Sequence, residues 1–222
     1  MSDFVLQRRM MVDCQLRTYD ITDAQVLDVM GELPRERFVA SGDQVIAYSD
    51  QPAAAADGPR GPATRYLLTP MVLARLVQAA RISEGERVLD VAAGTGYGAA
   101  LARRLGGAVV GVESDEGLVQ RANALLAELA PGAQVVQGAL DKGWPAGSPY
   151  DVIIVEGSFE LEPEALFAQL ADGGRLVGVK GTGRAGRAML YRKSGTVVSG
   201  RPIFDAAAPA LPEFRKAPAF VF

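Results

Sequence analysis

Two carboxylates that flank a glycine-rich turn are the residues of this sequence best placed to do chemistry. Asp90 lies in the apolar segment 88–91, which runs directly into Gly94 and Gly96, and Glu113 closes the next apolar segment. Glycines between a strand and a helix let the backbone approach a ligand closely, because glycine has no Cβ. The spacing therefore predicts a nucleotide-type cofactor site with acidic side chains beside the turn.

Two cofactor classes compete for this turn. Residues 94–99 match the G-x-G-x-x-G/A pattern of dinucleotide sites, and Glu113 follows at roughly the 20-residue distance of the acid that holds a ribose hydroxyl. In such a site the pyrophosphate lies against the turn, and the Asp90 carboxylate would repel it. S-adenosylmethionine has no phosphate, and its sulfonium and amino groups are cationic. Asp90 and Glu113 together therefore favour S-adenosylmethionine over NAD.

The chain has no histidine and a single cysteine, Cys14. The lack of histidine excludes Ser-His-Asp and Cys-His catalysis, a histidine general base and nearly every common zinc site. A lone cysteine forms no intramolecular disulfide, and we expect Cys14 to be a small buried hydrophobe. We expect no metal site.

The charge balance, 23 basic against 26 acidic residues, assigns no face to nucleic acid. Neither Trp144 nor Tyr191 belongs to a stacking platform for bases. No window approaches about 18 consecutive apolar residues, and the N-terminus lacks the apolar core of a signal peptide. We expect a cytoplasmic monomer that binds neither nucleic acid nor membranes.

From residue 86 onward, segments with strand and helix patterns alternate. This alternation predicts a doubly wound α/β fold, with a mostly parallel, Rossmann-like sheet and helices on both faces. The pair Ser194-Gly195 predicts an antiparallel C-terminal hairpin at the sheet edge. The expected strands lie near residues 87–92, 108–113, 133–138, 150–156, 174–180, 187–193 and 196–204, and the expected helices near 97–105, 115–129 and 163–170.

An N-terminal helical extension precedes this domain. Apolar spacing predicts two helices within residues 3–31, the second capped by Thr22 and ended by Gly31. Residues 41–65 lack apolar periodicity, and a loop of that length is usually functional or disordered.

A further helix over residues 67–80 begins with Thr69 as N-cap and Pro70 in its first turn. We expect residues 1–66 to form N-terminal helices and a substrate-side loop that pack on the main domain. Residues 67–222 would then form the cofactor-binding domain.

Residues 88–97 resemble the first motif of the class I methyltransferases. Other segments narrow the resemblance to one branch, the protein-L-isoaspartate O-methyltransferase family. The segments that resemble this branch are residues 11–17, 26–30 with 33–39, 47–52, 150–155 and 169–177. The resemblance covers roughly residues 5–180.

The resemblance implies an S-adenosylmethionine-dependent carboxyl methyltransferase that methylates L-isoaspartyl residues of damaged proteins for repair. Asp50 and residues 66–70 would shape the acceptor pocket, with Asp50 and Thr69 as the candidate catalytic residues. An acceptor carboxylate with a pKa near ~4 is ionised at pH 7, so the transfer requires no general base. The candidate cofactor-binding residues are Asp90, Ala92, Gly94, Thr95, Gly96, Tyr97, Glu113, Ser114, Ala139, Leu140 and Glu156.

Several positions depart from the family pattern. Leu68 stands where members carry a serine beside the methyl donor, which leaves Thr69 as the nearest hydroxyl. Ala139 and Leu140 follow Gly138 where members have Asp-Gly, whose acid commonly contacts the adenine. Asp141 could serve after a shift of register, or backbone and apolar contacts alone could hold the adenine. The inserted residues 58–62 have no recognised counterpart.

Glu156 ends a predicted strand where the family has a small or hydroxyl residue. It would place an anion near the sulfonium or contact the substrate; alternatively, it is a solvated carboxylate at a strand end. The departures leave two alternatives: a paralogue with another acceptor, and a sensor that binds S-adenosylmethionine or S-adenosylhomocysteine without turnover. An NAD-binding oxidoreductase is the weakest candidate, because no acid/base partner for hydride transfer is evident.

Overall fold

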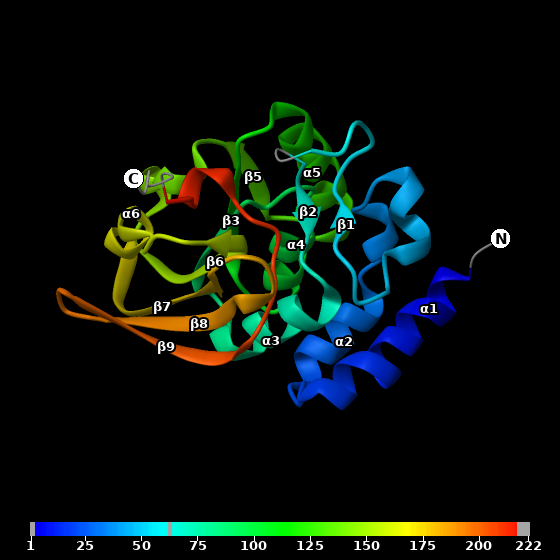
Figure 1. The fold of residues 1–222 in the computed structure, drawn as a ribbon, viewed down its shortest axis with the longest axis horizontal. Helices are drawn as coiled ribbons and strands as arrows, with labels where there is room; N and C mark the ends of the chain where they lie inside the picture. The colour runs from blue at the N-terminus through cyan, green and yellow to red at the C-terminus, as the bar shows by residue number, and fades with distance from the viewer. Residues whose placement is uncertain (1–2, 62–63, 217–222) are drawn as a thin grey trace, which may run out of the picture.

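A seven-stranded sheet, in the order β5-β4-β3-β6-β7-β8-β9, organises the molecule (Figure 1). The computed structural model describes residues 3–61 and 64–216. Strands β5, β4, β3, β6 and β7 run parallel to one another. Strand β8 pairs antiparallel with β7, and β9 pairs antiparallel with β8, as the sequence predicts. The strands are β3 (Arg87–Val91), β4 (Ala108–Glu113), β5 (Gln134–Gln137), β6 (Tyr150–Phe159), β7 (Leu170–Lys180), β8 (Arg187–Ser194) and β9 (Val197–Asp205).

Helices cover both faces of this sheet, which confirms the predicted fold class. Successive strand residues point to opposite faces, so Val88 of β3 packs in one core and Leu89 in the other. Helices α3 (Pro70–Ala80), α4 (Tyr97–Arg104) and α5 (Glu116–Leu129) contribute to the Val88 core, and the short α6 (Glu164–Ala168) to the Leu89 core. Among the described residues, no helix is long and apolar enough to span a bilayer.

The N-terminal helices differ from the prediction in detail. Helix α1 (Phe4–Met10) continues into one wider π-helical turn, and α2 (Ala24–Glu32) follows. The cap of α2 is Asp23, whose carboxylate accepts two backbone N–H bonds, so the expectation of Thr22 is wrong. Gly31 lies inside α2 rather than ending it.

The expectation of a buried Cys14 is also wrong, because its side chain is exposed. It lies in the π-helical turn Met11–Leu16, in which Met11, Val12 and Leu16 supply the buried side chains.

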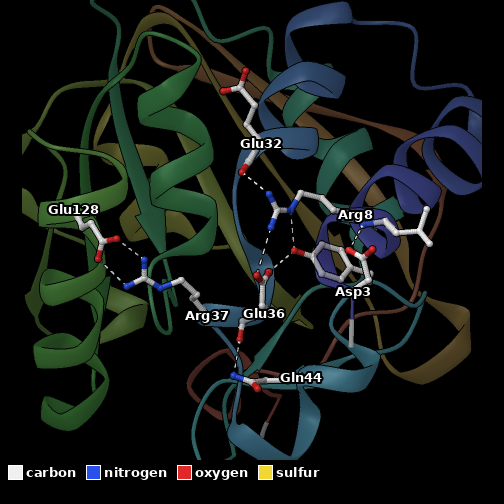
Figure 2. Close-up of polar contacts among 9 residues, drawn as sticks. Asp3, Arg8, Glu32, Glu36, Arg37, Gln44 and Glu128 are labelled. Carbon is white, nitrogen blue, oxygen red and sulfur yellow. Dashed lines mark hydrogen bonds and ion pairs between the residues drawn. The ribbon is translucent and has the colours of Figure 1, made fainter. Parts of the chain in front are cut away.

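Arginine side chains fix the N-terminal segment, both internally and against helix α5. Arg8 of α1 donates to the Glu32 carbonyl at 2.8 Å, and Arg37 pairs with both oxygens of Glu128 on α5 at 2.5 and 2.7 Å (Figure 2). Arg121, also on α5, donates to the carbonyls of Val39 and Ala55. Helix α5 thereby fixes the segment that precedes the long predicted loop.

The described part of the predicted loop over residues 41–65 is largely structured. A 3₁₀ turn forms at Ser41–Ile46, and β1 (Ala53–Ala54) pairs with β2 (Tyr66–Leu67) to close a small hairpin over residues 53–67. Helix α3 begins at Pro70 with Thr69 at its N-cap position, as predicted, although Thr69 makes no side-chain cap bond. The expected helical range began at residue 67, and this part of the prediction is wrong because Leu67 belongs to β2.

A C-terminal strap, residues 206–215, returns from β9 across the carboxyl end of β6 (Figure 1). The Ser158 N–H donates to the Pro209 carbonyl at 2.7 Å, and the Leu211 N–H donates to the Ser158 carbonyl at 3.0 Å. Gly157 permits this approach, because a Cβ there would lie 2.5 Å from Leu211 Cγ. The strap and the 53–67 hairpin both border the carboxyl end of the sheet.

Candidate active site

The glycine turn follows β3, the strand on either side of which the chain adds strands in opposite directions across the sheet. The chain runs from β3 outward to β5 and then returns to place β6 on the other side of β3. In open α/β sheets, ligands bind at the carboxyl ends of strands at such a switch point. Gly94 (φ +55°) and Gly96 (φ +88°) adopt left-handed conformations, and Gly96 caps α4. Ala92 is also left-handed (φ +64°), which costs roughly 1 kcal/mol for a residue with a Cβ.

Asp90 and Glu156 meet on one face of the sheet beside the start of α4. Asp90 pairs with Ile154 across β3 and β6, so Glu156, two residues farther along β6, is its diagonal neighbour on the same face. Both side chains are buried, with 0% and 3% of their surface exposed. The alternative that Glu156 is a solvated carboxylate at a strand end is therefore wrong. The two carboxyl groups lie beside each other next to Gly98, and neither Asp90 oxygen nor Glu156 Oε1 has a hydrogen-bond partner among the described residues.

Burial dominates the electrostatics of this carboxyl pair. It raises the pKa of Glu156 to about 7, with Asp90 and Arg35 acting in the opposite direction. It also raises the pKa of Asp90 well above its usual range, and the negative charge of Glu156 adds to that rise. The two groups therefore titrate together: Glu156 makes ionisation of Asp90 less favourable, whereas Asp90 favours the ionised form of Glu156.

Arg35 is a positive charge that lowers the pKa of Glu156. Its side chain is fully buried, and it donates to the carbonyls of Ala47 at 2.7 Å and Leu68 at 2.5 Å. The guanidinium lies 4.8 Å from the centre of the Tyr97 ring. Burial lowers the pKa of Arg35, whereas Tyr97 and Glu156 favour its charged form. Arg35 thus connects the start of α4 to the segment that precedes α3.

Glu113 lies at the end of β4, fully buried, and its carboxylate is saturated with donors. Its Oε2 accepts from the Gly94 N–H at 3.0 Å, and its Oε1 accepts from the N–H groups of Ser114 and Asp115. Arg65, directly before β2, completes the set with Nε to Oε2 at 2.9 Å and Nη2 to Oε1 at 3.1 Å. The hairpin thus places a bidentate guanidinium on the carboxylate that follows the glycine turn.

Two open cavities lie along the carboxyl end of the sheet. The β4 hollow, about 750 Å³, adjoins Arg65, Glu113 and Ser114 and extends to Pro212 of the strap. The α3 hollow, about 810 Å³, has Tyr66 and the start of α3 on one side and residues 205–209 on the other. The hairpin and the strap contribute walls to both hollows.

The predicted site residues fall into separate places. Asp50 and Thr69 line the α3 hollow, and Ser114 lines the β4 hollow. The buried group around the glycine turn consists of Asp90, Ala92, Gly94, Thr95, Gly96, Tyr97, Glu113 and Glu156. Ala139 is exposed, and Leu140 packs in the opposite core; neither borders the two hollows.

The sequence does not indicate the roles of three residues in this region. Arg65 and Arg35 are arginines in segments with no helical or strand pattern, and their carboxylate and carbonyl partners are distant in sequence. Gly98 belongs to the glycine motif in sequence, but its role in the structure is a different one: its lack of a Cβ makes room for the Glu156 carboxyl group. The signal in the sequence was the glutamate at position 156, where the family pattern has a small or hydroxyl residue, because this larger side chain needs additional space.

Comparison with known proteins places the chain in a family. The family profile of protein-L-isoaspartate(D-aspartate) O-methyltransferase matches residues 7–203. Protein-L-isoaspartate O-methyltransferase 1 of Rhodopseudomonas palustris (strain HaA2) is 37% identical over 177 residues, which are 79% of this chain and 70% of that protein. Protein-L-isoaspartate O-methyltransferase 2 of Anaeromyxobacter sp. (strain Fw109-5) is 40% identical over 176 residues, with the same coverage of both chains.

Solved structures agree with this assignment. A protein-L-isoaspartate O-methyltransferase superimposes with a TM-score of 0.80 at 27% identity; the match covers 92% of this chain and 65% of that one. A Plasmodium falciparum structure described as a beta-aspartate methyltransferase in complex with S-adenosyl-L-homocysteine shares the fold, with a TM-score of 0.76 at 18% identity over 93% of this chain and 98% of that one. With the glycine turn and N-terminal segments inside the matched region, this chain belongs to the protein-L-isoaspartate(D-aspartate) O-methyltransferase family.

Proposed function

We propose that this chain is an S-adenosylmethionine-dependent carboxyl methyltransferase that methylates L-isoaspartyl residues of proteins. Membership of the family supports the activity. The observation that carries the proposal is the gathering of Asp90, Glu156 and Glu113 around one glycine turn at the switch point of the sheet. Carboxylates directly beside the turn, as Asp90 and Glu156 are, suit a cationic cofactor rather than a dinucleotide, whose pyrophosphate they would repel.

Unpartnered buried oxygens around the turn support this cofactor. Both Asp90 oxygens, Glu156 Oε1 and the Tyr97 hydroxyl are buried with no donor or acceptor of ordinary geometry among the described residues. Buried polar atoms normally have partners, so the arrangement suits a ligand with a positive charge and N–H donors. The sulfonium and amino groups of S-adenosylmethionine have this chemistry, and we assign them to Asp90 and Glu156.

The remaining cofactor contacts follow from the same geometry. Glu113 is the acceptor assigned to the ribose hydroxyls, and Gly94 and Gly96 allow close approach of the backbone. When bound, S-adenosylmethionine supplies an electrophilic methyl group on its sulfonium. Ser114, on the wall of the β4 hollow, marks the side on which the nucleoside part would lie.

The chain has to hold and align the acceptor, and no proton transfer is required of it. An isoaspartyl carboxylate has a pKa near ~4 and is ionised at pH 7. Alignment of two reactants can contribute about 7–11 kcal/mol to lowering the barrier. We assign the α3 hollow to the acceptor segment, with Asp50 and the Thr69 hydroxyl as its polar contacts. Exclusion of water by the hairpin and the strap would protect the reacting groups.

One observation favours a second candidate, a family member with another acceptor. Leu68 is fully buried in the core and brings no hydroxyl to the α3 hollow, in contrast to the serine of the family pattern. In addition, Asp50 and Asp205 are acidic residues of the hollow, and their charge would weaken the approach of an anionic acceptor. An acceptor with less negative charge would suit this lining better.

A methyl-transfer assay tests the proposal. The purified protein is incubated with methyl-labelled S-adenosylmethionine and an isoaspartyl peptide, beside the aspartyl peptide of the same sequence. Base-labile label on the isoaspartyl peptide alone is the expected result. Binding of S-adenosylhomocysteine without transfer to either peptide would instead favour the second candidate, which a panel of other carboxylate acceptors would then examine.

A further inference from the structure

The Arg65–Glu113 pair occupies the carboxylate to which the proposed function assigns the ribose. The side chain of Arg65 is 11% exposed and that of Glu113 is 0% exposed, and both oxygens of Glu113 accept from the guanidinium. The stem of Arg65 also covers the glycine turn, since a Cβ on Gly94 would lie 3.3 Å from Arg65 Cγ. The guanidinium and a ribose diol would therefore compete for the same oxygens.

The geometry points to Arg65 as an internal competitor of the cofactor: it latches Glu113, and S-adenosylmethionine binds only after Arg65 has left that carboxylate. This inference rests on the proposed function, because it concerns the same site. A bidentate guanidinium–carboxylate pair is stronger than a pair of bonds from neutral hydroxyls, particularly when buried. The chain thus weakens its own affinity for the cofactor by the free energy needed to open the latch.

Arg65 has space to leave without disruption of the hairpin. Its side chain borders the β4 hollow, which is open to solvent and has a volume of about 750 Å³. The backbone around Arg65 is held independently of the guanidinium, because its carbonyl accepts from the Ala55 N–H at 2.9 Å and Ala54 pairs with Tyr66. A change of rotamer at residue 65 is sufficient to release Glu113.

The Glu113 carboxylate keeps hydrogen-bond donors from the backbone after this release. The N–H groups of Gly94 and Ser114 still donate to its carboxylate, at 3.0 and 2.7 Å. These bonds hold the oxygens toward the turn while the guanidinium side becomes free to accept ribose hydroxyls. We therefore expect that removal of the Arg65 side chain leaves the Glu113 carboxylate in its orientation and free to accept hydrogen bonds from the ribose hydroxyls.

Calorimetric titration with S-adenosylhomocysteine tests the latch without reference to turnover. Arg65→Ala should bind it about tenfold or more tightly than the wild type, the gain expected when a charge-assisted hydrogen bond no longer competes. Arg65→Lys keeps the charge but lacks the planar fork, and should lie between the two. Arg60→Ala is the matched control, because Arg60 is on the same hairpin but pairs with Asp43; its affinity should equal that of the wild type.

The outcomes separate the latch from the proposed function. Equal or weaker binding by Arg65→Ala and Arg65→Lys, with wild-type affinity in Arg60→Ala, would overturn the latch and leave the cofactor assignment intact. Failure of every folded variant and of the wild type to bind S-adenosylhomocysteine would overturn the proposed function and the latch with it. A cooperative thermal unfolding transition establishes that each variant is folded. If Arg65→Ala does not fold, the comparison of Arg65→Lys with the wild type still tests the latch.

Discussion

The carboxylate of Glu156 occupies the space that a side chain on Gly98 would fill. A Cβ at residue 98 would lie 2.8 Å from Glu156 Cδ and 3.3 Å from Asp90 Oδ2. The glutamate on β6 and the glycine on α4 are therefore one packing arrangement, although they are distant in sequence. This relationship explains why a bulky acid is accommodated at position 156, where the family pattern has a small or hydroxyl residue.

Gly98→Ala should destabilise the protein by about 1–3 kcal/mol, because the added methyl overpacks the buried carboxyl pair. In a Glu156→Ser background the same change should be neutral or stabilising, since alanine has the higher helix propensity. Urea unfolding of the two single variants and the double variant measures this coupling. Gly31→Ala is the control: Gly31 also lies within a helix, but the added Cβ would lie 3.7 Å from Val12 Cγ2, an ordinary contact distance. This change should not destabilise the protein. Additive effects of the two changes would contradict the packing relationship.

The carboxyl pair should make the protein less stable as the pH rises through neutrality. The pKa of Asp90 and that of Glu156 are both raised in the folded state, the latter to about 7. Between about pH 4 and pH 7 the folded state therefore binds more protons than the unfolded state, and the free energy of unfolding falls with rising pH. The slope can reach ~1.4 kcal/mol per pH unit for one proton. Urea unfolding between pH 5 and pH 8 measures it.

Glu156→Gln is the variant that examines this pH dependence. A glutamine amide can donate to Asp90 without titrating, so the slope between pH 5 and pH 8 should become shallower. An unchanged slope would show that other groups account for the dependence. Bound S-adenosylhomocysteine is omitted from these measurements, because a ligand that binds the folded state adds its own contribution to stability.

The strands and the glycine turn were predictable because local pattern determines them. Alternate residues of β3 enter the two cores, and Asp90 is on the same face as Val88 by simple alternation. Helix caps are less certain from sequence, since Thr22 and Asp23 are both good N-caps and only the observed bonds choose Asp23. The hairpin over residues 53–67 has two paired residues per strand, too few to give a periodic signal.

The charged contacts of the site were not predictable, because they depend on tertiary approach. Arg65 and Glu113 are separated by 48 positions, and no local pattern indicates that one will neutralise the other. Glu156 at a strand end is compatible with exposure until the position of α4 is known. The sequence thus indicated the kind of cofactor through residue types, whereas the competition for Glu113 required the folded chain.

Arg35→Lys should destabilise the protein by about 2–3 kcal/mol, because a lysine cannot donate to the carbonyls of Ala47 and Leu68 in the geometry of the guanidinium. It would also lose the stacking on Tyr97. Chemical unfolding at neutral pH measures the loss. Arg9→Lys, with an 81% exposed side chain and a 3.6 Å pair to Asp13, should change stability by no more than ~0.5 kcal/mol. A comparable effect of both substitutions would refute the structural role of Arg35.

Thr69→Val should lower methyl transfer without weakening the fold. The Thr69 hydroxyl is buried without a partner and makes no cap bond, so its loss breaks no bond of the described chain. Because the residue lines the α3 hollow, kcat/KM for an isoaspartyl peptide should fall about tenfold, the effect of one lost hydrogen bond. Thr18→Val, whose hydroxyl donates within the N-terminal helical segment, is the kinetic control. Unchanged kcat/KM in Thr69→Val, measured with urea unfolding on the same samples, would remove Thr69 from the acceptor site.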